Sequence, residues 1–223
     1  EILFVTDQDN GLQGLAEQFK DDVMSDHTSK LRLGSEVTSI NFSEDPNKGG
    51  IPGKVVVVAG TQCYHAKYVI ATPTVNWLEN FNFMNLLVPK VDTSNYAIEV
   101  ARIEKIYYQF NNVFWDRTKN YITVLTTNPN ECAIFVNYEV HKPGSKLLLC
   151  FASRKMIEGL MGAGSSIKLS DAGAIVALGG LKAAFGSAAT TPSKIFITDW
   201  YNDPHFRGSW EIWKFGKGFE DFA

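Results

Sequence analysis

The stretch "ARIEKIYYQFNNVFWD", residues 101–116, reads as a β-strand that runs into an aromatic turn, with a lysine in the middle of the strand. Side chains alternate between the two faces of a strand, so Lys105 shares its face with Ile103 and Tyr107. Two interpretations of this lysine are open. Its stem can lie along apolar surface while the ammonium stays in water, or its amine is held beside a reactive group.

The composition is that of an ordinary soluble globular protein. The chain has 223 residues, of which 45% are hydrophobic, enough for one large domain or two small ones. Its net charge is −3 and its charges are interspersed, which argues against nucleic acid or an anionic membrane as the main partner. No apolar run approaches the roughly 20 residues of a membrane span. The opening "EILFVTDQDN" has no features of a signal peptide. The sequence does not indicate in which cellular compartment the protein works.

The cysteines predict neither a metal site nor a disulfide. Cys63, Cys132 and Cys150 are odd in number and have no CxxC spacing, so we expect three free thiols. The four histidines are scattered, and no metal-ligand spacing is present. The sequence also has no Walker A, HExxH or GxSxG motif, and no GxGxxG between a strand and a helix.

Strands occur in runs and helices are grouped at particular points, which favours an α+β fold over repeated βαβ units. Apolar spacing predicts helices over 12–24, 154–161 and 170–185, the last with Ser170 as N-cap and Gly186 as a stop. A hairpin is predicted where "VVVVAG" meets "QCYHAKYVIAT". Further strands are expected at 103–110, 121–126, 133–138, 146–151 and 194–200.

Five segments, taken in order, resemble the flavin-dependent amine oxidase family, and most of all its polyamine oxidase branch. They are "FVTDQDNGLQGLAEQF" (4–19), "LRLGSEVTSINFS" (31–43), "YVIATPTVNWL" (68–78), "EKIYYQFNNVFWD" (104–116) and "DWYNDPHFRGSW" (199–210). The resemblance extends over nearly the whole chain. It implies a mixed, mostly antiparallel sheet flanked by helices, as in the substrate-binding domain of that family.

The resemblance also implies contacts with FAD. It places Val37 at the adenine end of the cofactor, and Thr72 and Pro73 where the chain passes near the flavin ring. Trp200 would border the flavin. Lys105 matches the family's lysine that holds a water against flavin N5, which favours the second interpretation of this residue.

Trp210 matches an aromatic wall of the amine site. Family members usually carry Tyr or Phe there, so the larger indole would keep an aromatic face while narrowing the site.

The implied domain organisation is incomplete. Residues 1–75 would be segments that return to the FAD-binding domain, 76–198 the substrate-binding domain, and 199–223 the start of a C-terminal FAD-domain segment. The family's GxGxxG half is missing from this sequence, so we expect a fragment that binds FAD poorly alone. Its exposed flank would be covered by the missing FAD-domain segments or by another protein chain.

Two functions follow from the resemblance. The first is a fragment of an FAD-dependent amine oxidase, which oxidises a polyamine-like amine to an imine by hydride transfer to the flavin, with O2 as re-oxidant. The alternative is a non-catalytic interaction or assembly module that lacks the FAD half. The missing GxGxxG favours the module, whereas Lys105 and the aromatic residues at 200 and 210 favour the oxidase.

Overall fold

The computed structural model describes residues 12–25, 30–42, 54–74, 76, 83–84, 97–161 and 169–218. The chain forms two compact units. The first unit consists of Glu1–Val69 and Asn82–Leu87, and the second of Ile70–Phe81 and Val88–Ala223.

The described residues of the first unit form one helix and a four-stranded sheet. Helix α1 (Leu12–Ser25) confirms the helix predicted over 12–24. The sheet has the order β3-β2-β1-β4, with β1 at Val37–Asn41, β2 at Val55–Ala59, β3 at Gln62–Ala66 and β4 at Phe83–Met84. Strands β2 and β3 form the predicted hairpin, which turns at Gly60 with a φ of 57°. Only β4 runs parallel to its neighbour, β1.

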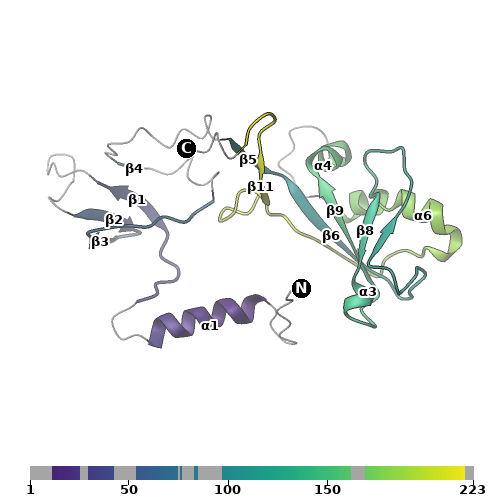
Figure 1. Ribbon diagram of the computed structural model, residues 1–223, viewed down its shortest axis with the longest axis horizontal. Coiled ribbons are helices and arrows are strands. Elements are labelled where there is room, and N and C mark those ends of the chain that lie inside the picture. Colours follow the sequence, from purple (N-terminus) through teal and green to yellow (C-terminus); the bar gives the residue numbers. More distant parts are fainter. Residues whose placement is uncertain are drawn as a thin grey trace. The chain divides into compact units, whose positions relative to one another are not determined.

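The second unit is built on an antiparallel five-stranded sheet, part of which is labelled in Figure 1. The order of its strands is β10-β6-β9-β8-β7. Its strands are β6 (Ile103–Gln109), β7 (Tyr121–Thr123), β8 (Ile134–Asn137), β9 (Leu147–Ser153) and β10 (Lys194–Ile197). A short helix, α3 (Tyr138–His141), follows β8, and a 3-10 turn, η3 (Gly186–Ala188), precedes β10. The largely antiparallel sheets with separate helices confirm the α+β class.

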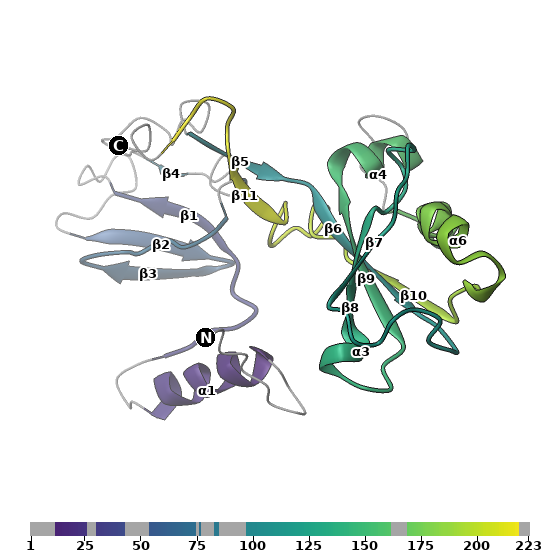
Figure 2. The same cartoon turned by 45° about the vertical axis from the view of Figure 1, so that its right-hand side comes forward.

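Alternation along β6 divides the sheet into two faces. Glu104, Ile106 and Tyr108 are buried, and the residues between them are half-buried. The buried face packs against α4 (Arg154–Met161), α5 (Asp171–Val176) and α6 (Gly179–Phe185), and α4 and α6 lie beside the sheet in both Figures 1 and 2. The Tyr108 hydroxyl donates a 2.8 Å hydrogen bond to the Ala174 carbonyl and so ties β6 to α5. The other face carries Lys105 and forms part of the candidate functional site.

The single helix predicted over 170–185 is wrong, because α5 and α6 are separate helices. Ser170 caps α5 as expected, by accepting from Gly173 N–H, and Gly186 ends α6 with a φ of 55°. The break between them lets the Ala177 carbonyl accept a 2.9 Å hydrogen bond from Cys132 N–H. Tertiary pairing thus outweighs the helical spacing of the segment.

The prediction of three free thiols is wrong for two of them. Cys132 and Cys150 form a disulfide within the core of the second unit, whereas Cys63 is free and exposed. Cys150 lies in β9 opposite Phe135 of β8, and Cys132 lies just before β8. Pairing of the strands, rather than any local motif, brings the two sulfurs together.

A two-stranded antiparallel ribbon, absent from the sequence prediction, adjoins the sheet. It pairs β5 (Ile98–Ala101) with β11 (Trp210–Trp213). Strand β5 runs into β6, and Arg102 is the one residue between them. Among the described residues, no helix combines the length and apolar character needed to cross a membrane.

Candidate functional site

The candidate site begins where β5 passes into β6. Lys105, the third residue of β6, pairs with Phe151 of β9, and its ammonium nitrogen lies 6.0 Å from the centroid of the Phe151 ring. An ammonium at that distance from a ring face is attracted by the negative face of the π system. Lys105 is thereby directed along the half-buried face of the sheet.

The segment 198–209, which joins β10 to β11, forms the next part of the site. Strand β10 was predicted to reach Trp200 but ends at Ile197. Beyond that point the carboxylate of Glu104, which is only 2% exposed, accepts the hydrogen bonds of the segment. Its donors are the Thr198 hydroxyl at 2.6 Å, Trp200 N–H at 3.1 Å and Tyr201 N–H at 3.1 Å.

Two contacts hold Trp200, at the start of this loop, against residues near the end of the loop. Its indole meets the ring of Phe206 edge to face, with centroids 4.9 Å apart, and its carbonyl accepts a 3.0 Å hydrogen bond from Gly208 N–H. Gly208 has a φ of 154°, and a Cβ there would collide with the side chain of Val100. Only glycine therefore allows the loop to close against β5.

Ser209 fixes the start of β11. Its hydroxyl donates to the Ala101 carbonyl at 2.9 Å and accepts from Ile103 N–H at 2.7 Å, so it spans the junction between β5 and β6. Trp210, the next residue, pairs with Ala101 and places its ring 6.3 Å from that of Phe151. The indole is more than half exposed.

These residues line a half-open cavity of about 270 Å³, here called the lysine cavity. Three residues that the sequence singled out separately, Lys105, Trp200 and Trp210, all line it. The rest of its lining is Ile103, Phe151, Phe206, Gly208 and Ser209. An ammonium group surrounded by aromatic faces can orient an amine or hold a water molecule.

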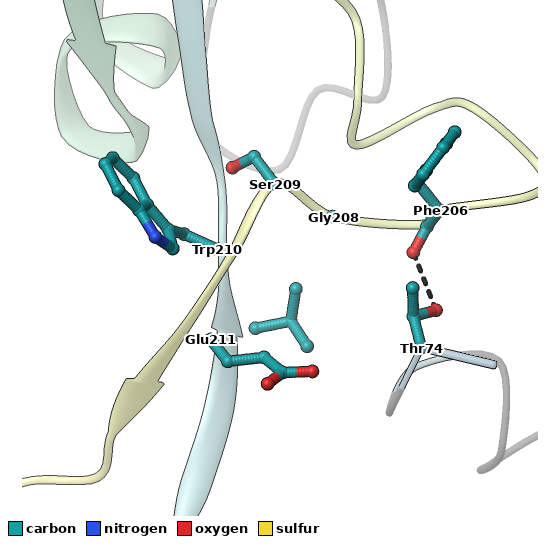
Figure 3. Close-up of a pocket in the computed structure, with 7 residues that line it drawn as sticks. Thr74, Phe206, Gly208, Ser209, Trp210 and Glu211 are labelled. Atoms are coloured by element: carbon teal, nitrogen blue, oxygen red, sulfur yellow. Dashed lines mark hydrogen bonds between the residues drawn. The ribbon is translucent and has the colours of Figure 1, made fainter. Parts of the chain in front are cut away.

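A second cavity, of about 470 Å³, lies on the other side of β11 and is here called the glutamate cavity. Figure 3 shows Trp210 and Glu211 pointing to opposite sides of the strand, with Glu211 on the side of Thr74. The Thr74 hydroxyl donates a 2.8 Å hydrogen bond to the Phe206 carbonyl, drawn as a dashed line in Figure 3. The wall formed by Phe206, Gly208, Ser209 and Trp210 is common to both cavities.

The other predicted cofactor contacts are placed less directly. Thr72 is exposed and Pro73 half-buried, and both precede Thr74 in a segment without regular structure. Neither is among the residues that line the two cavities. Val37 begins β1 in the first unit, opposite Ala59, and it lines neither cavity.

Sequence reasoning missed Glu104, Phe151 and Ser209. Glu104 had a usable signal, because it falls on the same face of the predicted strand as Ile106 and Tyr108, and a carboxylate on an apolar face needs partners. Phe151 and Ser209 gave no such signal, since their roles come from strand pairing. Within the described ranges, no group of three or more His, Cys, Asp or Glu side chains is placed to hold a metal ion.

The sequence matches the family described as "Flavin containing amine oxidoreductase" over residues 2–223. The chain belongs to the flavin-containing amine oxidoreductase family. Membership implies FAD in the complete protein. No curated protein matches the sequence.

Two solved amine oxidases share the fold. Putrescine oxidase bound to putrescine superposes with a TM-score of 0.66 at 14% identity, covering 91% of this chain and 42% of its own. Cyclohexylamine oxidase from Brevibacterium oxydans IH-35A gives a TM-score of 0.63 at 17% identity, covering 89% of this chain and 40% of its own. This amine oxidoreductase chain therefore spans about two fifths of their length.

Proposed function

We propose that this chain is the substrate-domain portion of an FAD-dependent amine oxidase, which oxidises a polyamine-like amine to an imine with O2 as re-oxidant. The observation that carries the proposal is the convergence of Lys105, Trp200 and Trp210 on one cavity. These residues come from two segments of the sequence, and family resemblance alone assigned them a role. Family membership supports the general chemistry.

The lining of the lysine cavity suits the ring end of a flavin. It offers aromatic faces and one ammonium donor in a half-enclosed space. When bound, the flavin supplies the redox chemistry, by accepting a hydride equivalent from the carbon beside the amine and passing the electrons to O2. The chain's own residues then orient the amine, exclude bulk water and hold a proton-bearing water.

Lys105 and Trp210 take distinct parts in this proposal. The ammonium of Lys105, which lies 6.0 Å from the centroid of the Phe151 ring, would donate a hydrogen bond to a water molecule beside a bound flavin. Trp210 presents an exposed indole face, on which the substrate amine can rest. Trp200, held in place by contacts with Phe206 and Gly208, would border the bound cofactor.

The proposal extends to the remaining cofactor contacts and to the domains. Val37, Thr72 and Pro73 would meet FAD mainly through their backbone. Residues 1–75 would return to the FAD-binding domain, 76–198 would form the substrate-binding domain, and 199–223 would begin a C-terminal FAD-domain segment. Since the sequence has no GxGxxG between a strand and a helix, these 223 residues alone are expected to bind FAD poorly and to oxidise nothing.

The choice of a polyamine-like substrate is supported by the carboxylate of Glu211, which lines the glutamate cavity. A diamine has a second ammonium group, and Glu211 offers a counter-charge in the glutamate cavity, across the wall that the two cavities share. Comparing turnover of aliphatic diamines with that of cyclic or aromatic monoamines tests this choice. A clear preference for monoamines would exclude the polyamine class.

The experiment that tests the oxidase is Lys105→Met in the complete protein. Turnover and flavin reoxidation should fall strongly while circular dichroism shows the fold intact. Lys194→Met is the matched control, because Lys194 is an exposed lysine of the same sheet, on β10, and lines no cavity described here. Equal kinetics for the two variants would make Lys105 an ordinary surface lysine.

A non-catalytic module is the second candidate, and exposed apolar side chains favour it. Trp210 is 57% exposed and Phe215 is fully exposed, so this flank is suited to burial against FAD-domain segments or another chain. Purification of the natural protein discriminates between the two functions. Flavin absorbance supports the oxidase, whereas a colourless protein that copurifies with a partner chain supports the module.

A further inference from the structure

We propose that Glu104 is a positioning residue of this site. Its carboxylate positions Trp200 directly and the Lys105 peptide through Thr198. The geometric part stands on the fold alone, and its kinetic consequence rests on the proposed oxidase function. Glu104 lies on the buried face of β6 and lines neither the lysine cavity nor the glutamate cavity. It therefore acts through its neighbours.

The carboxylate takes the place of strand pairing for the backbone N–H groups of Trp200 and Tyr201, which follow the end of β10. Its Oε2 accepts from the Thr198 hydroxyl at 2.6 Å and from Trp200 N–H at 3.1 Å, and its Oε1 accepts from Tyr201 N–H at 3.1 Å. A buried charge is tolerated where several donors satisfy it, and two of these donors are backbone groups that the strand no longer pairs.

The Thr198 hydroxyl extends this network to Lys105. While donating to Glu104, it accepts a 2.8 Å hydrogen bond from Lys105 N–H. Thr198 N–H in turn donates to the Lys105 carbonyl at 3.0 Å. A continuous chain of hydrogen bonds thus runs from the Lys105 peptide through Thr198 and Glu104 to the Trp200 peptide.

The other contacts of the loop do not substitute for this carboxylate. Ser209 fixes the far end of the segment, next to Trp210, and Gly208 N–H binds the carbonyl side of Trp200. The amide side of Trp200 bonds to Glu104. Loss of the carboxylate should therefore release Trp200 while leaving Trp210 in place.

Glu139 provides a matched control. It is also a buried glutamate of the second unit, and it accepts hydrogen bonds from two backbone N–H groups, Gly144 at 2.9 Å and Lys146 at 2.8 Å. It lines neither cavity. A Glu→Gln exchange at 104 and at 139 replaces one acceptor oxygen by a donor group at each, so both exchanges leave a backbone N–H without an acceptor.

The test uses the complete protein labelled with fluorotryptophan. The ¹⁹F resonance of Trp200 is assigned by its loss in Trp200→Phe. We expect Glu104→Gln to shift and broaden this resonance, Thr198→Val to shift it less, and Thr198→Ser to restore it. Glu139→Gln should leave it unchanged. In amine oxidation, kcat of Glu104→Gln should fall about 10- to 100-fold with little change in KM, as displacement of a positioned group produces.

An unchanged Trp200 resonance in Glu104→Gln and Thr198→Val, with native circular dichroism, would overturn the proposal. If Glu104→Gln does not fold, the Thr198 pair decides alone, because valine keeps the shape of threonine without its hydroxyl. Failure of the oxidase function gives a different pattern. The Trp200 resonance would then respond as expected while the wild-type protein oxidises no amine.

Discussion

Glu104 and Lys105 are consecutive residues of β6, and their side chains lie on opposite faces of one sheet. Glu104 is 2% exposed and binds the segment after β10, whereas Lys105 lies against Phe151 at the lysine cavity. Since the side-chain period of a strand is two, a register slip of one residue would exchange their environments. The seven consecutive pairs between β6 and β9 hold the register that keeps them apart.

Trp210→Ala should weaken amine binding in the complete protein. Loss of an exposed indole face removes a cation–π or stacking contact of about 1–1.5 kcal/mol, equivalent to roughly a 10-fold rise in Kd or KM. Steady-state kinetics measures it. Trp213→Ala is the control, since Trp213 lies in the same strand but lines neither cavity. An equal effect at both positions would refute a specific role for Trp210.

Gly208→Ala should destabilise the loop more than a similar change at another glycine with positive φ. The added Cβ collides with Val100, at a cost of about 1–3 kcal/mol beyond the backbone strain. Gly216→Ala is the control, because Gly216 has a φ of 76° and no neighbour within reach of a Cβ. Urea denaturation measures both variants, and Val100→Ala should recover part of the loss in Gly208→Ala.

Glu139→Gln should lower stability in a pH-dependent way. Hydrogen bonds from Gly144 and Lys146 N–H groups hold the pKa of the Glu139 carboxyl below its usual value of 4.5. Its contribution is therefore present above pH 4.5 and is lost as the pH falls through the lowered folded-state value. Denaturation midpoints of the two proteins should differ at neutral pH and converge in acid. A difference that persists at low pH would point to packing instead.

Reduction of the Cys132–Cys150 disulfide should destabilise the second unit by about 2–4 kcal/mol, since the bond restricts the unfolded chain. Denaturation with and without reductant measures this loss. Cys132→Ser should lower stability to a similar degree, whereas Cys63→Ser, at an exposed free thiol, should have no effect. Two or more reactive thiols in the unreduced, denatured protein would contradict the bond.

Local patterns predicted the elements whose signals lie within a single segment. The alternation of 103–109, the amphipathic spacing of 12–24 and the Ser170 cap all appear as expected. The ribbon of β5 and β11 did not, because β11 is four residues long and exposed along its whole length. The disulfide depends on the pairing of β8 with β9, and the break between α5 and α6 accompanies the hydrogen bond from Cys132 N–H to the Ala177 carbonyl. Both are contacts between distant segments, which one sequence does not display.

For the site, the sequence supplied residues without their arrangement. Lys105, Trp200 and Trp210 were found through family resemblance, and the structure adds the cavity that they share. Glu104 has a signal in the strand alternation, because it shares a face with Ile106 and Tyr108, but the alternation does not identify its hydrogen-bond partners. Its partners, Thr198 and Trp200, lie more than ninety residues away and become visible only when β10 pairs with β6.

The wall formed by Phe206, Gly208, Ser209 and Trp210 serves two cavities at once. Substitutions in this wall that are meant to change the volume of one cavity would therefore reshape the other in the same step. Independent tuning is possible only at residues that face a single cavity, such as Phe151 on one side and Glu211 on the other. A directed-evolution library aimed at selectivity would therefore begin at those two positions and leave the shared wall untouched.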